Sequence, residues 1–534
     1  SACSGQGGSK EGNTGNATPA QTETKSASSS TGLKSTGYKA PDAANVNPKG
    51  EFPVVKNPVK LTFAIATNPK IENFDTNQYT QYLEKKTGVD IVFQFLPAGN
   101  ETLQKAMLMF ASKDLPDVFV GINFSDVTIL DYSTQGMIVP LNDLINTYGV
   151  EMQNMWAKAV DNTNLKKTMT YADGNIYYIP KFSEQTQNTY NIRAYAYEPW
   201  LKKLGLNLPT TVDEYYKMLV AFRDQDPNGN GKKDEIPLIG QKNGNIPQFF
   251  INSFIHDSGK DENHLILKNG KVDVNYNKPE FKEALMWLNK LATEKLLDPM
   301  TFTQDEAQLK VLMTTPDVQV GSMSQSTKTG ILDRNVEMTR KRSEDYVPLL
   351  PLKGPAGVAY CHPTPTTPLA AYVITSACKN PAAAYRVGDL MLSLEATLNG
   401  RIGFEGQDWY VPEKGVIGVN GQQATMDLKR DVWGMKTHNV HWQFPQPGFF
   451  PRYVFDTRAR PNNLKEYDYV QITNSYELAK FVAKEVVPRK LSYTLAEMDE
   501  FAVLQPEIST YVEENITKFI VGDKKFSEWD AYVA

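Results

Sequence analysis

The sequence predicts an α/β protein built from two lobes, each with its own sheet and helices. With 534 residues the chain is too long for one compact core, so two or three domains are expected. Strand-like and helix-like segments alternate from Lys60 to Val120, and the alternation begins again after about Pro180. This order predicts a parallel sheet with helices on both of its faces.

Five elements follow one another in the first part of the chain. The run KLTFAIA at 60–66 alternates and is rich in strand-forming residues, as a half-buried strand requires. The helix after it carries Tyr79, Tyr82 and Leu83 on one face and should stop at Gly88. In order, the pattern predicts a strand at 60–66, a helix at 76–86, a strand at 90–96, a helix at 101–113 and a strand at 117–120.

The second part of the chain contains three clear helical patterns. Thr211 followed by Glu214 has the form of a capping box and opens the first helix. A second helix is predicted at 279–295, and apolar residues keep helical spacing over 508–520. The sequence therefore predicts a second α/β lobe with extra helices.

Composition excludes several classes of protein. The net charge of −5 arises from interspersed signs, whereas a nucleic-acid-binding protein would carry a basic stripe. No run of about 18 apolar residues is present, so the sequence predicts no membrane-spanning helix. An ordinary water-soluble fold that binds no nucleic acid is expected.

The N-terminal segment differs from the rest. Residues 1–55 are mostly small and polar after Ser1, Ala2 and Cys3, which predicts a disordered tether because too little apolar surface can be buried. The start SACSG resembles the end of a bacterial lipobox, in which Cys3 would be lipidated after removal of a signal peptide. A chance cysteine in a flexible tail is the alternative. The other two cysteines, Cys361 and Cys378, could pair or stay free and buried.

The run FRDQDPNGNGKKDEI at 222–236 matches an EF-hand-type calcium loop from Asp224 to Glu235. Oxygen donors at alternating positions can wrap a calcium ion, and the glycines permit the tight turn. No second EF-hand flanks it, so a structural ion is favoured over a calcium sensor. A surface turn that binds no metal is the alternative.

Several phrases, in order from Lys60 to Tyr532, resemble bacterial extracellular solute-binding proteins of ABC importers. They are LPDVF at 115–119, GMIVPLNDL at 136–144, YADGNIYYIP at 171–180 and LGLNLPTTVDE at 204–214. The ending YVEENITKFIVGDKKFSEWDAY at 511–532 is similar to the large lipoprotein subgroup of Gram-positive bacteria. Each phrase is weak alone, and their common order makes the resemblance specific.

The resemblance implies a periplasmic-binding-protein-like clamshell of class II type, with several hinge crossings. The crossings would lie near Pro180, near 348–363 and near 401–409. The implied domains are a lipid-anchored linker at 1–55, a first lobe at 56–180 plus 350–402, and a second lobe at 181–349 plus 403–534.

Within the superfamily, the calcium loop resembles that of alginate-oligosaccharide-binding proteins. Their register begins one step later than the EF-hand pattern and leaves Asp224 spare. The implied calcium ligands are Asp226, Asn228, Asn230, the carbonyl of Lys232, Asp234 and Glu235.

The implied function is capture of an oligosaccharide and its delivery to the membrane subunits of an ABC permease. The protein would be a monomer, lipid-anchored on the outer face of the cytoplasmic membrane, and it would break no bond. Sugar recognition uses aromatic faces and fixed hydrogen-bonding groups, which we expect in loops at strand ends and after the third crossing. The candidate ligand-binding residues are Asn68, Asn73, Asn123, Ser125, Arg193, Ser324, Glu405, Gln407, Trp409, His438, Trp442 and Phe450.

Packing within the protein is the competing role for each of these candidates. Two other functions are also weighed. A carbohydrate-active enzyme would need two placed carboxylates, a zinc site or a nucleophile elbow, and the sequence offers no clear sign of any. A binder of peptides or of another solute would have a cleft with charged ends and little aromatic stacking.

Overall fold

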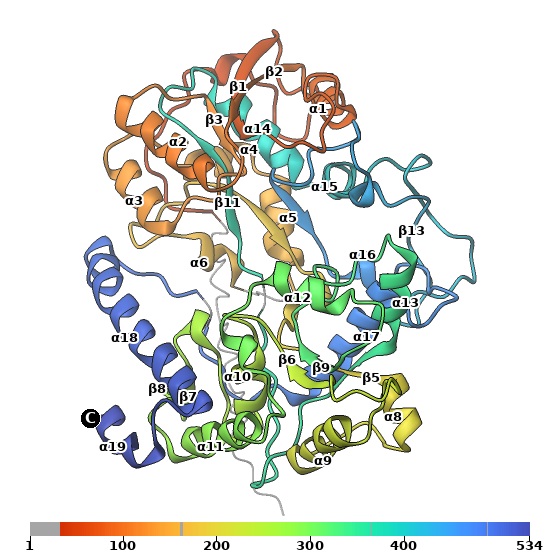
Figure 1. The fold of residues 1–534 in the computed structure, drawn as a ribbon. Helices are drawn as coiled ribbons and strands as arrows, with labels where there is room; N and C mark the ends of the chain where they lie inside the picture. The colour runs from red at the N-terminus through yellow and green to blue at the C-terminus, as the bar shows by residue number, and fades with distance from the viewer. Residues whose placement is uncertain (1–31, 161–163, 365, 489) are drawn as a thin grey trace, which may run out of the picture.

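The computed structural model describes residues 32–160, 164–364, 366–488 and 490–534. Two main sheets form the centres of two lobes, the first at the top of Figure 1 and the second at the bottom. The predicted α/β architecture of two lobes is confirmed. Among the described residues, no helix combines the length and apolar character needed to cross a bilayer.

The first lobe is built on a six-stranded mixed sheet. β1 pairs in parallel with β2 and β3, as the alternating strands and helices predict, whereas β11 runs antiparallel to both β3 and β4. The strands in spatial order are β14 (Gly448–Phe450), β4 (Ile179–Ser183), β11 (Leu369–Ile374), β3 (Val118–Val120), β1 (Val59–Ala66) and β2 (Val89–Leu96).

Helices cover this sheet, and local signals set their ends. Asn77 caps α1 by accepting the amide of Tyr79, and Gly88 ends it with φ of +73°, a conformation that glycine adopts without strain. The helices of this lobe are α1 (Gln78–Thr87), α2 (Asn100–Ser112), α3 (Asp126–Thr134), α4 (Asn142–Tyr148), α5 (Glu151–Lys158), α6 (Leu165–Met169), α14 (Pro381–Met391) and α15 (Leu394–Arg401).

Residues 32–55 are ordered on the first lobe, which corrects the prediction that all of 1–55 is a disordered tether. Val46, Val54 and Val55 are buried in the core of the first lobe. The carboxylate of Asp42 accepts the amides of Ala382 and Ala383 at the start of α14, at 3.0 and 2.9 Å. A few apolar residues and one helix-capping acid thus fix a segment whose composition alone suggests disorder. Cys3 lies outside the described residues.

The second lobe is built on a four-stranded sheet. Its order is β10 (Tyr346–Pro348), β5 (Ala194–Tyr197), β9 (Val320–Ser324) and β6 (Ile236–Ile239). A hairpin, β7 (Leu265–Lys268) and β8 (Lys271–Val274), lies outside this sheet. The helices are α8 (Glu198–Leu204), α9 (Val212–Asp224), α10 (Ile246–Ile251), α11 (Pro279–Thr293), α12 (Glu306–Met313), α13 (Glu337–Asp345), α17 (Tyr467–Leu478) and α19 (Trp529–Val533).

The predicted start of α9 is confirmed with one difference. The Thr211 hydroxyl accepts the amide of Glu214 at 3.1 Å, while the Glu214 carboxylate returns to the amide of Thr210 at 2.8 Å rather than to Thr211. The helix predicted at 279–295 corresponds to α11. Cys361 and Cys378 are both buried and free.

A 27-residue helix, α18 (Leu495–Val521), spans both lobes. Near its start, Leu495 and Met498 pack against the core of the first lobe. Near its end, Val512, Ile516 and Phe519 are buried in the core of the second lobe. Figure 1 shows α18 running along the left side of the molecule between α3 and α11.

The chain passes between the lobes after β4, through the short helix α7 (Thr186–Thr189) to β5, and again between β10 and β11. The segment 403–445 remains with the first lobe, because His438 pairs with Ile71 and Trp442 lies in the first core. β14 then joins the first sheet, so the return to the second lobe follows 450 rather than 401–409. Residues 403–450 thus lie outside the lobe to which the sequence assigns them.

Candidate binding cleft

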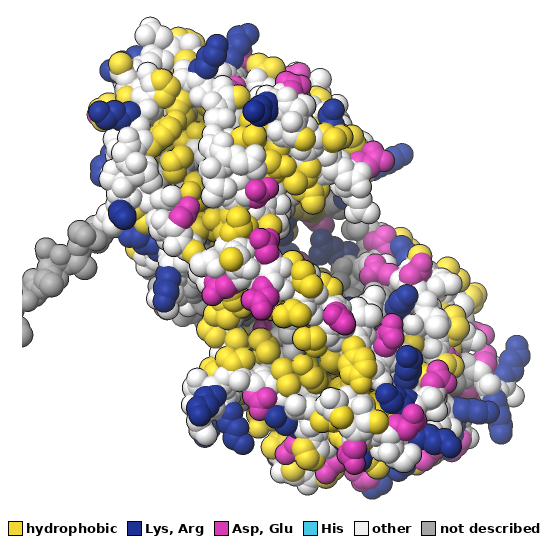
Figure 2. Space-filling view, turned by 90° about the vertical axis from the view of Figure 1, so that its left-hand side faces the viewer, with side chains coloured by type: hydrophobic (Ala, Val, Ile, Leu, Met, Phe, Trp, Pro, Cys, Tyr) yellow, Lys and Arg dark blue, Asp and Glu magenta, His cyan; other side chains and the backbone are white. Residues whose placement is uncertain are grey.

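A cavity of about 480 Å³ lies between the two lobes. Its walls come from α15 and the 430–433 turn on one side, and from α13 and the start of α17 on the other. The first crossing adds Gln185, Gln187 and Asn188. Figure 2 shows the surface narrowing to a waist between the two lobes. A cavity formed by both lobes and a crossing is the candidate ligand cleft.

The first-lobe wall of the cleft holds a guanidinium against two aromatic rings. The guanidinium carbon of Arg401 lies 4.3 Å from the ring centroid of Trp433 and 5.1 Å from that of Phe444. Stacking holds the group by its face and leaves its N–H edge available. Within the described ranges the Arg401 side chain has no hydrogen bond or ion pair to protein. Burial lowers the pKa of Arg401 to about 10, so it remains charged at neutral pH.

Two lysines fix this aromatic cluster. Lys181, on β4, donates to the carbonyl of Phe444 at 3.1 Å and lies 5.3 Å from the centroid of its ring. Burial, and then the charge of Arg401, lower the pKa of Lys181 to about 8. Lys70 donates to the carbonyl of Trp433 at 2.8 Å, which ties the turn that carries Trp433 to the loop after β1.

Ion pairs dominate the rest of the lining. Arg334 lies 3.0 Å from Asp431 and 3.6 Å from Asp468. Arg458 lies 3.2 Å from Asp468, and its other partner is Asp427 at 3.3 Å. Most charges that face the cleft are therefore already paired within the protein.

The N-terminus of α17 supplies a different kind of group. Glu466 caps the helix by accepting the amide of Tyr469 at 3.0 Å. Burial, and then the neighbouring Asp468, raise the pKa of Glu466. No cation of the described residues forms an ion pair with it. Glu466 thus presents a hydrogen-bond acceptor at the cleft.

The polar residues predicted at the strand ends of the first lobe mainly stabilise their own turns. Asn68 accepts the amide of Lys70, and Asn73 accepts the amide of Asp75. Ser125 caps α3 by accepting the amide of Thr128. Asn123 is exposed, with φ of +56°. None of these four lines the cavity.

Arg193 and Ser324 lie inside the second lobe. Arg193 is 1% exposed and donates to the carbonyls of Gln187 and Ser326 and to the side chains of Asn474 and Ser475. The Ser324 hydroxyl donates to the carbonyl of Arg193 at 2.7 Å. This arrangement holds β5, β9 and α17 together. Among the described residues, no carboxylate of the other lobe pairs with Arg193.

The loop after α15 divides into an exposed part and a buried part. Glu405 and Gln407 are exposed, and the Gln407 amide donates to Gln78 at 2.9 Å. Trp409, on β12 (Trp409–Tyr410), is buried and donates to the carbonyl of Gly403 at 3.0 Å. β12 pairs with β13 (Asp427–Leu428) to form a small hairpin beside the cleft.

The aromatic loop at 436–453 lies against the first lobe. Trp442 is 0% exposed, and its indole N–H donates to Thr80 at 2.8 Å. Gly121, with φ of +73°, allows this loop to approach, since a Cβ there would lie 2.6 Å from Pro445. His438 is buried beside Gln443, and Phe450 stacks on Phe455. Rings enclosed in this way cannot stack on a sugar in this conformation.

Sequence reasoning missed Arg401, Trp433 and Arg334. Trp433 receives no role in the sequence analysis, although it lies in an irregular segment, DVWGM at 431–435, just before the aromatic loop. It belongs to the short 3-10 turn Val432–Gly434. A tryptophan in a loop, with no apolar periodicity around it, was the available signal.

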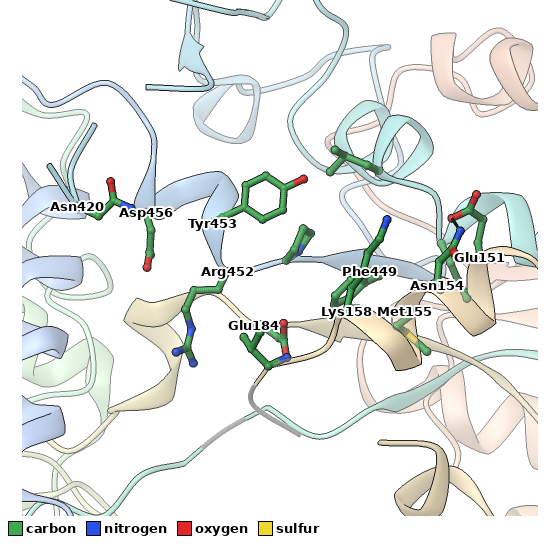
Figure 3. A pocket seen from close by; sticks show the side chains of 14 residues that line it. Glu151, Asn154, Met155, Lys158, Glu184, Asn420, Phe449, Arg452, Tyr453 and Asp456 are labelled. Carbon is green, nitrogen blue, oxygen red and sulfur yellow. Dashed lines mark hydrogen bonds between the residues drawn. The ribbon is translucent and has the colours of Figure 1, made fainter. Parts of the chain in front are cut away.

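A second cavity of about 480 Å³ lies at the edge of the first sheet. Its side chains come from α5 on one side and from the turn between β14 and α16 (Tyr453–Asp456) on the other (Figure 3). Burial raises the pKa of Glu184 to about 7 and also raises that of Asp456. Met155, Phe449 and the leucines Leu392 and Leu394 make this cavity more apolar than the cleft.

The predicted calcium loop gathers its side chains around Asp234. The amides of Asn228 and Asn230 donate to the Asp234 carboxylate at 2.9 and 3.0 Å. The Asp226 carboxylate accepts the amides of Gly229 and Gly231 inside the loop, whereas Asp224 turns to Arg223 at 2.8 Å. Lys232 continues the turn by donating its amide to the side chain of Asn230.

The donor set of this loop fits calcium. One oxygen of Glu235 is buried without a hydrogen-bond partner, and burial raises the pKa of this carboxyl. Calcium prefers carboxylate, amide and carbonyl oxygens, which are the groups gathered here. Across the described ranges, no three His, Cys, Asp or Glu side chains converge as metal ligands. The two asparagines present their nitrogens to Asp234 and would have to turn their oxygens toward an ion.

Comparisons with known proteins agree with this geometry. The sequence profile of the bacterial extracellular solute-binding proteins matches residues 42–397. The fructooligosaccharide ABC transporter substrate-binding protein FusA of Streptococcus pneumoniae is 28% identical over 508 residues, which is 88% of this chain and 86% of that protein.

Solved structures show the same fold. FusA in complex with kestose superposes with a TM-score of 0.67 and 25% identity, covering 89% of this chain and 94% of that one. An EF-hand mutant of FusA with fructo-nystose gives a TM-score of 0.67 at 24% identity over the same shares of the two chains. A solute-binding protein for HMO from Bifidobacterium longum infantis gives 0.72 at 19% identity, covering 89% of this chain and 95% of that one. With a profile that spans two thirds of its length and a cleft between two α/β lobes, the chain belongs to the bacterial extracellular solute-binding proteins.

Proposed function

We propose that this protein is the substrate-binding component of an ABC importer and that it captures an oligosaccharide in the cleft between its lobes. One observation carries the proposal: the guanidinium of Arg401 stacks on Trp433 and Phe444 in a cavity lined by both lobes, and its N–H edge is available to a ligand. Aromatic faces and fixed hydrogen-bonding groups together are what sugar recognition uses. FusA, which aligns over most of the chain, is named for fructooligosaccharides.

Binding would close the cleft. A ligand that contacts α15 and Trp433 on one wall and α13 and α17 on the other makes its full set of contacts only in the closed state. The ligand therefore binds the closed state more tightly than the open state, and this difference in affinity drives closure. The closed form is then recognised by the membrane permease, and no bond in the ligand is broken.

The loop at 226–235 would hold a structural calcium ion. Asp226, Asn228, Asn230, Asp234, Glu235 and the carbonyl of Lys232 would be its ligands. Two observations support this: the side chains of Asn228 and Asn230 cluster around Asp234, and one oxygen of Glu235 has no hydrogen-bond partner. In addition, one solved structure of FusA is described as an EF-hand mutant. The ion would fix the turn between α9 and β6 and take no part in capture.

The chain would act as a monomer on the outer face of the cytoplasmic membrane of a Gram-positive bacterium. Lipidated Cys3 would anchor it, and the polar segment that follows would serve as the tether. Mass spectrometry of the protein from its native membrane tests this: a diacylglyceryl group on Cys3 is expected, and an unmodified N-terminus in the membrane fraction would contradict it.

Calorimetric titration with a panel of oligosaccharides and peptides tests the main proposal. Saturable binding of an oligosaccharide, without release of shorter products on prolonged incubation, is expected. Cleavage of any sugar would favour a carbohydrate-active enzyme, and binding of peptides alone would favour the peptide-binding alternative. Trp433→Ala should weaken sugar binding at least about tenfold, as loss of a stacking ring in a binding site does. Trp156→Ala, outside the cleft, is the matched control.

A further inference from the structure

We propose that the ligand of this cleft is an uncharged oligosaccharide, and that Arg401 acts as a two-pronged hydrogen-bond donor to its hydroxyl oxygens. The inference rests on the proposed function and adds the chemical class of the sugar. The relatives do not decide it, since one is named for fructooligosaccharides and another for polygalacturonan and rhamnogalacturonan.

The charges of the cleft carry the argument, beginning with the cations. Six basic side chains line the cavity, and five of them are bonded to a carboxylate of the protein. The pairs are Arg334 with Asp431 at 3.0 Å, Arg340 with Glu344 at 2.9 Å, Arg430 with Asp408 at 2.5 Å, Arg458 with Asp468 at 3.2 Å and Lys465 with Glu198 at 2.9 Å. Arg401 is the sixth.

The acids of the lining are also nearly all paired. Glu344, Asp431 and Asp468 are the partners of arginines. Glu466 is the fourth acid, and it accepts only amides at the start of α17. Of the described residues, the lining therefore has one cation and one anion that lack an opposite partner, and their charges cancel.

An acidic oligosaccharide does not suit this balance. A uronate chain carries a negative charge on every ring, and burying each charge without a cation is costly. Among the described residues that line the cavity, Arg401 is the one cation without a carboxylate partner. Lys181 is close to it, but its ammonium donates to the carbonyl of Phe444 and is not part of the cavity lining. Recruiting the other arginines would require breaking ion pairs that already exist.

A neutral sugar fits the same groups without such a cost. Each hydroxyl both donates and accepts a hydrogen bond. The edge of Arg401 offers parallel N–H donors, fixed in direction by Trp433 and Phe444. Glu466 offers the complementary acceptor, and the paired side chains beyond them provide donors and acceptors without net charge. The cleft is thus polar and directional while remaining electrically balanced.

Two measurable properties of ligand binding show whether Arg401 recognises the ligand by hydrogen-bond geometry or by charge. Binding of a neutral sugar depends little on ionic strength, because no net charge is neutralised. The geometry of the guanidinium fork also matters more than its charge, so a lysine cannot replace it. If Arg401 instead acts through its positive charge alone, lysine would retain most of the affinity.

The experiment is calorimetric titration of the full chain at 50 and 500 mM NaCl. The neutral probes are 1-kestose, maltotriose, xylotriose and cellotriose. The acidic probe is trigalacturonate, with its methyl ester as an uncharged version of the same skeleton. We expect a neutral probe to bind with a Kd that changes less than about threefold with salt. Arg401→Gln and Arg401→Lys should both weaken that binding about tenfold or more.

Controls keep the test independent of folding and of long-range charge. Lys436→Gln removes one exposed positive charge near the same turn and should leave Kd within about twofold. Unfolding curves establish that each variant is folded, and the salt dependence of the unaltered protein needs no variant at all. The inference is overturned if trigalacturonate binds at least tenfold more tightly than its methyl ester, if Kd rises more than tenfold with salt, or if Arg401→Lys binds normally. Binding of peptides and of no saccharide would overturn the proposed function, and this inference with it.

Discussion

Arg334 and Asp431 form an ion pair across the cleft, with Nη2 3.0 Å from Oδ2. Arg334 precedes α13 in the second lobe, and Asp431 precedes the turn that carries Trp433 against the first lobe. The pair thus joins the two walls beside the site at which ligand is proposed to bind.

We expect Arg334→Gln to favour the open state and to weaken ligand binding. Each partner is about one-third exposed, and a pair of this kind contributes roughly 0.2–1 kcal/mol. The Kd should therefore rise by up to about fivefold. Small-angle scattering should show a larger radius of gyration without ligand. Arg340→Gln, whose partner Glu344 is one turn away on α13, should leave the radius unchanged, and an equal effect of both variants would refute the cross-cleft role.

Removal of calcium should lower the stability of the protein and leave sugar affinity nearly unchanged. An ion bound only by the folded state adds about 2.7 kcal/mol when its concentration is 100 times the Kd. We expect chelation with EGTA to lower the melting temperature, and Asp226→Asn to abolish this response. Asp224→Asn is the matched control, because Asp224 binds Arg223 and lies outside the loop's hydrogen bonds. An identical response of the two variants would contradict the register that begins at Asp226.

Arg193→Gln should destabilise the second lobe. The guanidinium is buried and satisfies two carbonyls and two side chains, and each buried group left without a partner costs about 1–3 kcal/mol. A loss of roughly 3 kcal/mol in the free energy of unfolding is expected from urea denaturation. Arg460→Gln, at an exposed site, should stay within about 0.5 kcal/mol. Unchanged stability of Arg193→Gln would mean that the network is dispensable.

The stability that His264 provides should be greatest below about pH 6.5. Burial opposes its charge, but Asp257 and Glu513, each 2.7 Å from one ring nitrogen, raise the pKa of His264 to about 10. An imidazole in the unfolded chain titrates near pH 6.5. Because the folded pKa is higher, the stabilisation is complete below pH 6.5 and is lost as the pH rises through about 10.

Comparison of His264→Gln with the unaltered protein at pH 6 and pH 10.5 tests this. The difference in unfolding free energy should be about 3 kcal/mol at pH 6, as for a broken buried pair, and should shrink at pH 10.5. A difference that grows with pH would show that His264 is neutral in the folded state.

Local patterns predicted the elements of the fold well. Alternation at 60–66, the stop at Gly88 and the cap at Thr211 all act through neighbouring residues, and the structure contains each of them. The antiparallel β11 and the return of β14 to the first sheet depend on contacts distant in sequence. Such contacts leave no local periodicity, so the third crossing could not be located from the sequence.

The candidate site was harder to predict than the fold. Trp442 lies in a loop and Trp409 on a two-residue strand within a long loop region, where ligand-binding aromatics often occur, yet both rings are enclosed by the protein. Trp433 lies in a similar loop and faces the cavity. Whether a tryptophan faces the cavity or the core depends on which side of its loop packs against α15 and against the loop after β1. A single sequence does not contain that information.

The two ends of α18 are embedded in different lobes. Any hinge rotation must therefore bend this helix or tilt it, and Pro506 marks a point where one backbone hydrogen bond is missing and bending costs least. We expect the outer surface of α18 to change its angle when the cleft closes. A pair of spin labels on either side of Pro506 would then report, from outside the molecule, whether the cleft is filled.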